Sequence, residues 1–334
     1  MNLSNKSDKE NIDDFMKSNN NIVYDVSVII ASYNPLWAKL KLTLDSIIVQ
    51  KDVAMQIIVA DDGSEDNLFN KVSEYFIING FNNYKLISSE ENKGTVANFL
   101  KASMEAEGKY IKGISPGDCL YKSDTLHNWI SSLRGSGKKW SFADAVYYNI
   151  NENIPQTIIL DSHPQHIYPY LQNNDVACRW NYVVLDDIAL GAAILCERTI
   201  LIEYLKRIEG KVKYAEDNIW RMMMFDGVIG FYYNDVAIVY EYGTGVSTSG
   251  NEIWYERLRE DWRVANIEML NKAKDKFQEK MAKAVMHRLE NRNIISALFI
   301  KGKLKLYIRK KLFPRKTPNI DVSKLSYFNQ QEEG

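Results

Sequence analysis

Five carboxylates have the residue type and the local setting for chemistry: Glu216, Asp217, Asp61, Asp62 and Asp118. An acid beside a second acid can act as a general base whose neighbour orients it or raises its pKa. An acid at the end of a strand can accept a hydrogen bond from a nucleobase or a ribose hydroxyl. Each residue also has a structural interpretation, because acids favour helix N-termini and Asp-Gly or Pro-Gly-Asp sequences favour turns. These residues alone leave both interpretations open.

The elements that must position these residues alternate between strand and helix patterns. Apolar, β-branched runs predict buried strands over 26–32, 56–60, 84–88 and 109–114. Helical spacing predicts helices over 36–48, 67–79, 95–107 and 124–133, the last capped by Ser123. This alternation predicts an α/β fold with a mostly parallel sheet, in which ligands bind beyond the carboxyl ends of the strands. That rule selects the loops 32–35, 61–66 and 115–118.

Two further features in the first half of the chain could bind a ligand. Tyr33 follows the first strand, where a base could stack on its ring, although a packed aromatic is an equal alternative. Asn92, Lys93 and Gly94 precede a helix, where an anion is favoured. Taken alone, the second feature is explained better by an ordinary glycine-containing helix start.

The second half of the chain has a looser pattern. Strands are expected over 145–150, 157–160, 228–233 and 236–241. Helices are expected over 198–208, preceded by the apolar segment 190–196, and over 215–227. Beyond residue 250 the pattern is helical. Residues 1–22 form a polar tail without the apolar core of a signal peptide.

Composition limits the class of protein. The 334 residues are 46% hydrophobic, which is enough for a large core, and the 42 basic and 43 acidic residues balance to a net charge of −1. This balance argues against a nucleic-acid partner. Three widely spaced cysteines indicate a reducing compartment, and no apolar run is long enough to cross a bilayer. We therefore expect a cytoplasmic protein, or one bound peripherally to the inner face of the cell membrane.

The order of the motifs SVIIASYN, IIVADDGSEDN, ENKGTVANF, YIKGISPGDCLY and AEDNIW is distinctive. It resembles the family 2 inverting glycosyltransferases of the GT-A fold, over residues 23–247. The resemblance implies a GT-A domain there, with a Rossmann-like, mostly parallel central sheet flanked by helices. Residues 248–334 would then be a C-terminal helical extension.

The resemblance also implies roles for matching residues. Asp217 would be the catalytic base, with Glu216 beside it. The donor nucleotide, most often that of a UDP-sugar, would contact one group of positions: Ala31, Tyr33, Asp62, Asn92, Lys93, Gly94, Gly117 and Asp118. The acceptor, a glycan or a lipid-linked glycan in cell-surface polysaccharide synthesis, would contact Trp180, Gly191 and Tyr242.

The implied metal site departs from the family pattern. Asp118 matches the last acid of the motif that holds Mn²⁺ or Mg²⁺, but Ser115, Pro116 and Gly117 replace the others. Many members have a histidine where this chain has Tyr242. A cation could still bind through Asp118, diphosphate oxygens and water, and Lys93 or another cation could instead stabilise the leaving group.

Residues 294–313 combine Leu, Ile, Phe and Tyr with Lys and Arg. This composition is typical of a helix on an anionic lipid surface, although a solvated helix face is the usual alternative. Two other functions also remain open. A degenerate GT-A domain could act as a non-catalytic binding partner in a glycosyltransferase complex, and a nucleotidyltransferase would need a triphosphate loop that the sequence lacks.

Overall fold

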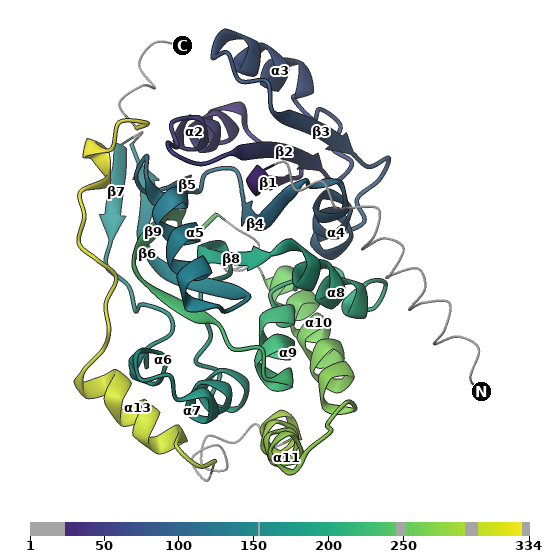
Figure 1. The fold of residues 1–334 in the computed structure, drawn as a ribbon, viewed down its shortest axis with the longest axis vertical. Helices are drawn as coiled ribbons and strands as arrows, with labels where there is room; N and C mark the ends of the chain where they lie inside the picture. The colour runs from purple at the N-terminus through teal and green to yellow at the C-terminus, as the bar shows by residue number, and fades with distance from the viewer. Residues whose placement is uncertain (1–23, 153, 245–251, 291–299, 329–334) are drawn as a thin grey trace.

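The computed structural model describes residues 24–152, 154–244, 252–290 and 300–328, and its centre is one mixed sheet covered by helices (Figure 1). Within these residues the sheet has nine strands, in the order β3-β2-β1-β4-β8-β6-β9-β5, with β7 beside β6. The elements keep the order that the sequence pattern predicts, and the α/β fold class is confirmed.

The first half of the chain forms the parallel part of the sheet. Its strands are β1 (Tyr24–Ser32), β2 (Met55–Asp61), β3 (Tyr84–Ser88) and β4 (Gly108–Ile114). The connecting helices are α2 (Trp37–Ile48), α3 (Phe69–Ile78) and α4 (Thr95–Glu105). Because all four strands run the same way, their carboxyl ends meet at one edge of the sheet, as the ligand-binding rule requires.

The second half adds strands of both directions. They are β5 (Cys119–Leu120), β6 (Trp140–Asn151), β7 (Ile154–Ile158), β8 (Ile194–Glu197) and β9 (Phe231–Glu241). β8 runs antiparallel to β4 and β6, whereas β9 runs parallel to β6. Helical segments between them are α5 (Thr125–Ser136), α6 (Tyr168–Leu171), α7 (Asp175–Arg179), η1 (Trp180–Val184), η2 (Gly191–Ala193), α8 (Arg198–Ile208) and α9 (Asn218–Asp226).

Three local predictions differ from the structure. The N-cap of α5 is Asp124 rather than Ser123, and the helix continues to a left-handed Gly137. The two strands expected over 228–241 are one strand, β9, whose pairing with β6 shifts register near Asp144. A bulge keeps such a strand continuous while it changes which residues face the core. The helix expected from 215 begins only at Asn218, which leaves Asp217 as its N-cap.

The two faces of the sheet bury separate apolar clusters. In β1, for example, Ile29 packs on one side, and Val28 and Ile30 pack on the other. Buried strands covered on both faces have continuous apolar runs, as residues 26–32 do.

The C-terminal part of the chain packs onto the same core. α10 (Glu252–Leu270) and α11 (Lys276–Glu290) bury residues such as Met269 and Val285 in the cluster that also holds α9. After α13 (Lys303–Leu312), the chain returns past the 3-10 turn η3 (Val322–Lys324) and lies beside β7. Thr157 Oγ1 there donates a hydrogen bond to the carbonyl of Ile320.

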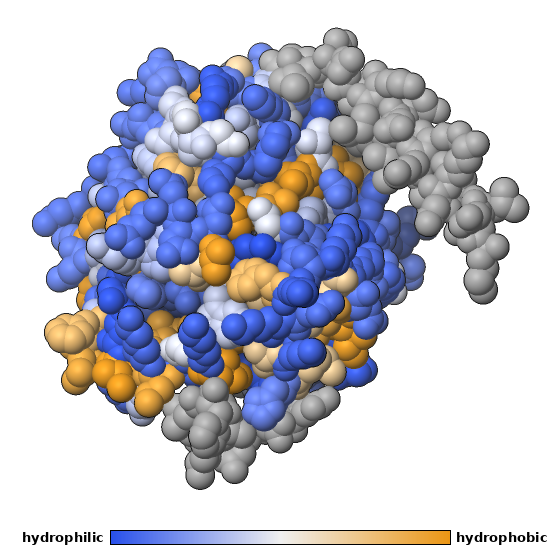
Figure 2. Space-filling view, turned by 60° about the horizontal axis from the view of Figure 1, so that its bottom comes forward, coloured by the Kyte–Doolittle hydropathy of each residue, from blue (hydrophilic) through white to orange (hydrophobic). Residues whose placement is uncertain are grey.

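Helix α13 leaves most of its apolar side chains exposed. Leu304, Ile308 and Leu312 are 46–65% exposed, and Phe313 beyond the helix is 73% exposed. Apolar residues gather at the lower left of Figure 2, on the side of the molecule where Figure 1 places α13. Residues 294–299 of the predicted amphipathic segment lie outside the described residues. Among those described, no helix meets the length and hydropathy needed to cross a membrane.

Candidate active site

Asp217 is held by two neighbours from different parts of the chain. Trp220 Nε1 lies 3.3 Å from Asp217 Oδ1 and donates a hydrogen bond to it. Gly191, at the start of η2, lies so close that a Cβ at this position would collide with both carboxylate oxygens. The carboxylate is therefore fixed at the start of α9, with its oxygens directed at the backbone of the chain segment before β8.

The pKa values of Glu216 and Asp217 are both raised. Shielding from bulk solvent raises the pKa of Asp217, while the Trp220 hydrogen bond opposes this shift. Burial, followed by the charge of Asp217, raises the pKa of Glu216 well above its usual range. Both shifts favour the protonated carboxyl groups, and an ionised Asp217 opposes the ionisation of Glu216.

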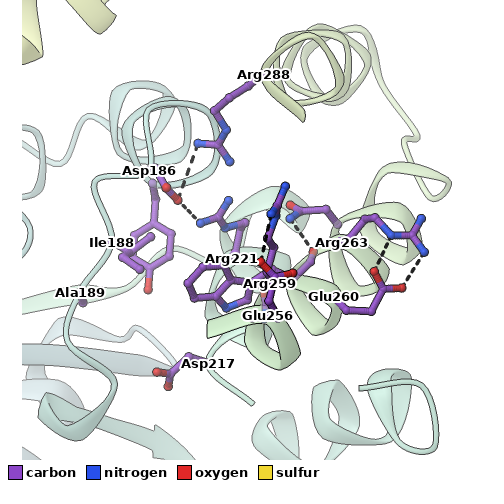
Figure 3. Close-up of a pocket in the computed structure, with 14 residues that line it drawn as sticks. Asp186, Ile188, Ala189, Asp217, Arg221, Glu256, Arg259, Glu260, Arg263 and Arg288 are labelled. Carbon is purple, nitrogen blue, oxygen red and sulfur yellow. Dashed lines mark hydrogen bonds and ion pairs between the residues drawn. The ribbon is translucent and has the colours of Figure 1, made fainter. Parts of the chain in front are cut away.

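Asp217 lines two cavities. The first, of about 310 Å³, extends from Glu216 and Asp217 to Asp118 and Glu241, and Ala31 also lines it. The second, of about 560 Å³, lies toward α10 and α11 and contains several arginines (Figure 3). Trp262 is the other residue that lines both. A carboxylate shared by two cavities can contact one ligand on each side.

At the far end of the first cavity, β4 runs into the turn 115–118. Gly117 has a φ of +102°, and a Cβ there would collide with the carboxylate of Glu241. Glu241 ends β9, and its carboxylate occupies the space beside Gly117 that an acidic side chain at this position would need. Lys39 of α2 binds this carboxylate, with Nζ 2.7 Å from Oε1.

Asp118 is buried next to a second cation. Asp118 Oδ1 accepts a hydrogen bond of 3.0 Å from the backbone N–H of Glu241. Burial raises the pKa of Asp118 to about 7, and burial lowers the pKa of nearby Lys112 to about 7. Lys112 lies within β4 and donates to the carbonyls of Gly113 and Ala192. Sequence reasoning missed Lys39, Lys112 and Glu241, although a lysine inside the apolar run 109–114 was a visible signal.

The donor set at this end suits a hard divalent cation only in combination with a ligand. Asp118 and Glu241 supply carboxylate oxygens, and Mg²⁺ typically takes one or two carboxylates together with phosphate oxygens and water. Within the described residues, no group of three or more His, Cys, Asp or Glu side chains forms a complete metal site. Asp118 and Glu241 therefore fit a cation that a diphosphate helps to bind.

The predicted nucleotide side of the site is built on Asp62. Its two carboxylate oxygens accept hydrogen bonds from the backbone N–H groups of Lys93 and Gly94, at 2.9 and 2.8 Å. Gly94 has a φ of +92°, and a Cβ there would collide with Lys213. Asp62 is thus buried and fixes the loop before α4, while neighbouring Asp61 binds Ser64 and serves the turn.

Two other residues on this side have groups free to meet a ligand. Tyr33 is 53% exposed at the end of β1. Asn92 Oδ1 is buried and has no hydrogen-bond partner in the part of the chain that the structure describes. A buried acceptor of this kind is costly unless a donor satisfies it, so a ligand N–H would be favoured there.

Two predicted acceptor residues lie elsewhere. Trp180 donates to the carbonyl of Lys301 and packs against Phe277, and it lines neither of the two cavities. Tyr242 packs edge to face on Tyr147 and lines a separate surface cavity beside β7. Gly191, the third predicted residue, lies against Asp217 as described above.

The class of the domain follows from three features together. The sheet has the strand order 3-2-1-4, a carboxylate pair lies at the start of α9, and a single acid follows β4. These features define a GT-A type domain. The family comparison agrees with this class. Residues 27–187 match the family described as Glycosyl transferase family 2, so this segment belongs to that family.

Individual proteins show the same likeness. An uncharacterized glycosyltransferase of Mycoplasma genitalium is 34% identical over 105 residues, a match that covers 30% of this chain and 33% of that protein. S. aureus TarS, solved in complex with UDP, is 18% identical, with a TM-score of 0.50 over 79% of this chain and 71% of that chain. A mannosyltransferase of Pyrobaculum calidifontis, solved with GDP-Man and Mn²⁺, is 15% identical, with a TM-score of 0.52 over 90% and 87% of the two chains. At these identities the solved structures support the GT-A fold alone.

Proposed function

We propose that the protein transfers a sugar from a nucleotide-sugar, most readily a UDP-sugar, to an acceptor hydroxyl with inversion at the anomeric carbon. The observation that carries this proposal is the position of Asp217 between two cavities. One cavity ends at Asp118 and Glu241, where a diphosphate can be held. The other leaves room for an acceptor.

Asp217 is the general base in this proposal. Inversion is a single displacement, in which a base removes the proton of the acceptor hydroxyl while the diphosphate departs from the opposite side. Gly191 and Trp220 fix the carboxylate, so it does not need to reorient during reaction. Burial and the charge of Asp217 raise the pKa of Glu216, which opposes a second negative charge beside the base.

The leaving diphosphate needs positive charge near Asp118. Asp118 and Glu241 would hold Mn²⁺ or Mg²⁺, which when bound stabilises charge on the leaving group. Lys39 brings a fixed ammonium to the same place, next to Glu241. Calorimetric titration of Mn²⁺ with UDP into wild type and Glu241→Gln tests the ligand assignment, and identical affinities would contradict it.

The nucleotide would lie toward Tyr33, Asp62 and the loop 92–94. Tyr33 can stack on the base, and the unsatisfied Asn92 Oδ1 can accept an N–H. UDP and GDP-Man in the solved relatives support nucleotide-sugar donors in general. The acceptor in this proposal is a glycan or lipid-linked glycan of the cell surface.

A membrane surface is a further proposed partner. Leu304, Ile308 and Leu312 are exposed on α13, which also carries Lys305, Arg309 and Lys311. An apolar face flanked by basic residues fits an anionic lipid surface through both burial and charge.

A donor screen tests the proposed activity. We expect wild-type protein to release the nucleoside diphosphate from at least one of a panel of UDP-, GDP- and dTDP-sugars in the presence of Mn²⁺ or Mg²⁺. Binding of UDP without release from any donor would instead favour the non-catalytic alternative, for which the missing acids at 115–117 are the supporting observation.

A further inference from the structure

The second cavity lined by Asp217 contains a cluster of cations around Asp186. Asp186 follows η1 and points into the space between α9 and α11 (Figure 3). Arg221 of α9 forms an ion pair with Asp186 Oδ1, and Arg288 of α11 has Nη1 3.7 Å from the same oxygen. Lys303 also acts on this carboxylate and lowers its pKa together with the two arginines, against the effect of burial. Three cations thus surround one acid.

The rim of the same cavity is balanced. Arg259 and Arg263 of α10 pair with Glu256 and Glu260 on their own helix, three residues away. Figure 3 shows the Arg263–Glu260 pair apart from Asp186, whereas the Arg259–Glu256 pair overlaps Arg221 in this view. The lining as a whole is balanced, because its four arginines face four acids, Asp186, Asp217, Glu256 and Glu260. An excess of cations over acids occurs only locally, around Asp186.

Arg221 and Arg288 are sheltered yet keep donors for a ligand. Their side chains are 12% and 18% exposed. Among the described residues, Arg221 donates only to Asp186, and Arg288 donates to the carbonyl of Val184 at 3.1 Å. A guanidinium has five N–H donors in a planar fork that matches an oxyanion, and shielding from water strengthens such a bond.

This cluster does not serve the leaving diphosphate. The diphosphate end of the site is at Asp118 and Glu241 in the first cavity, whereas Arg221 and Arg288 line only the second. An anion bound by these arginines must therefore belong to the molecule that approaches Asp217 from the other side.

We infer that the acceptor carries a phosphate or carboxylate group, which Arg221 and Arg288 bind while its hydroxyl meets Asp217. This inference rests on the proposed function, because only a transferase has an acceptor here. Arg221 follows Asp217 by four residues on α9, which places the two about 6 Å apart along the helix axis. The anionic group and the reacting hydroxyl would thus contact side chains about one helical turn apart on α9.

Matched acceptor pairs test the inference in the full chain with UDP bound. The probes are glycerol 3-phosphate against glycerol, N-acetylglucosamine 1-phosphate against its methyl glycoside, and glucuronic acid against glucose. Calorimetry should show at least one charged member binding about tenfold tighter than its neutral partner. Arg221→Gln and Arg288→Gln should each abolish this preference without changing UDP affinity.

Two further variants distinguish a direct contact between Arg221 and the ligand from a purely structural role of Arg221. Because loss of Arg221 leaves Asp186 without its ion pair, Arg221→Lys is measured alongside and should keep part of the preference. Arg257→Gln, on the exposed side of α10 and outside the cavity, should behave as wild type. Equal binding of charged and neutral probes, no binding of any charged probe, or an intact preference in Arg221→Gln and Arg288→Gln would overturn the inference. If the wild-type protein does not bind UDP at all, the proposed function would be overturned instead.

Discussion

At the scale of residues, the chemistry depends on how Asp217 is surrounded. A hydrogen bond to the charged form of an acid lowers its pKa, and Trp220 makes the only such bond that opposes the shift at Asp217 within the described residues. A base works when ionised, so activity should rise as the pH increases through the raised pKa of Asp217.

Trp220→Phe should move the acidic limb of the pH–rate profile to higher pH. The variant removes the indole N–H that favours the carboxylate, so a higher pH is needed to ionise Asp217. The control is Trp129→Phe, a buried tryptophan whose Nε1 has no partner among the described residues. An unshifted profile in Trp220→Phe, with the same loss of thermal stability as the control, would show that Trp220 only packs.

Gly191→Ala should reduce turnover on the order of 100-fold, because a displaced catalytic group loses its alignment with the substrate. The added Cβ would collide with both carboxylate oxygens of Asp217. Gly135→Ala is the matched control, because a Cβ there meets nothing within 4 Å. This substitution should stabilise α5 by about 0.5–1 kcal/mol and leave turnover unchanged. Full activity in Gly191→Ala would show that the carboxylate is not held at this backbone.

At the scale of elements, the local sequence patterns predicted individual strands and loops but not the contacts between distant segments. The buried strands and the loops at their ends followed from apolar runs, and these loops contain Tyr33, Asp62 and Asp118. The ion pair of Lys39 with Glu241 joins residues 202 positions apart, and no spacing rule connects them. Arg288 likewise reaches the cavity only because α11 packs beside η1. The cluster of cations around Asp186 therefore could not be predicted from sequence.

Helix α13 should bind anionic lipid through its exposed face. We expect co-sedimentation with vesicles containing phosphatidylglycerol, weaker at high salt and absent with purely zwitterionic vesicles. Replacing Ile308 and Leu312 with Ser should reduce binding, whereas replacing the more exposed Ile77 and Ile78 of α3 should not. Binding that ignores vesicle charge, or that survives the α13 substitutions, would rule out this surface.

At the scale of the whole molecule, the sheet and the C-terminal helices line different cavities beside Asp217. In the proposed function, the carboxyl edge of the parallel strands forms the donor side, and α10 and α11 line the cavity proposed for the acceptor. Asp217 is at the boundary between them. The residues of the proposed donor side and the proposed base were recognisable in the sequence, whereas the second cavity depends on packing between elements that are distant in sequence.

The most direct test of this account is Asp217→Asn, with nucleotide release and UDP binding measured on the same preparation. Loss of the general base should slow release from the best donor by about 100-fold or more while UDP affinity stays unchanged. Asp235→Asn, an exposed acid in β9, should match wild type in both measurements. Normal turnover by Asp217→Asn would contradict the assignment of Asp217 and, with it, the proposed mechanism.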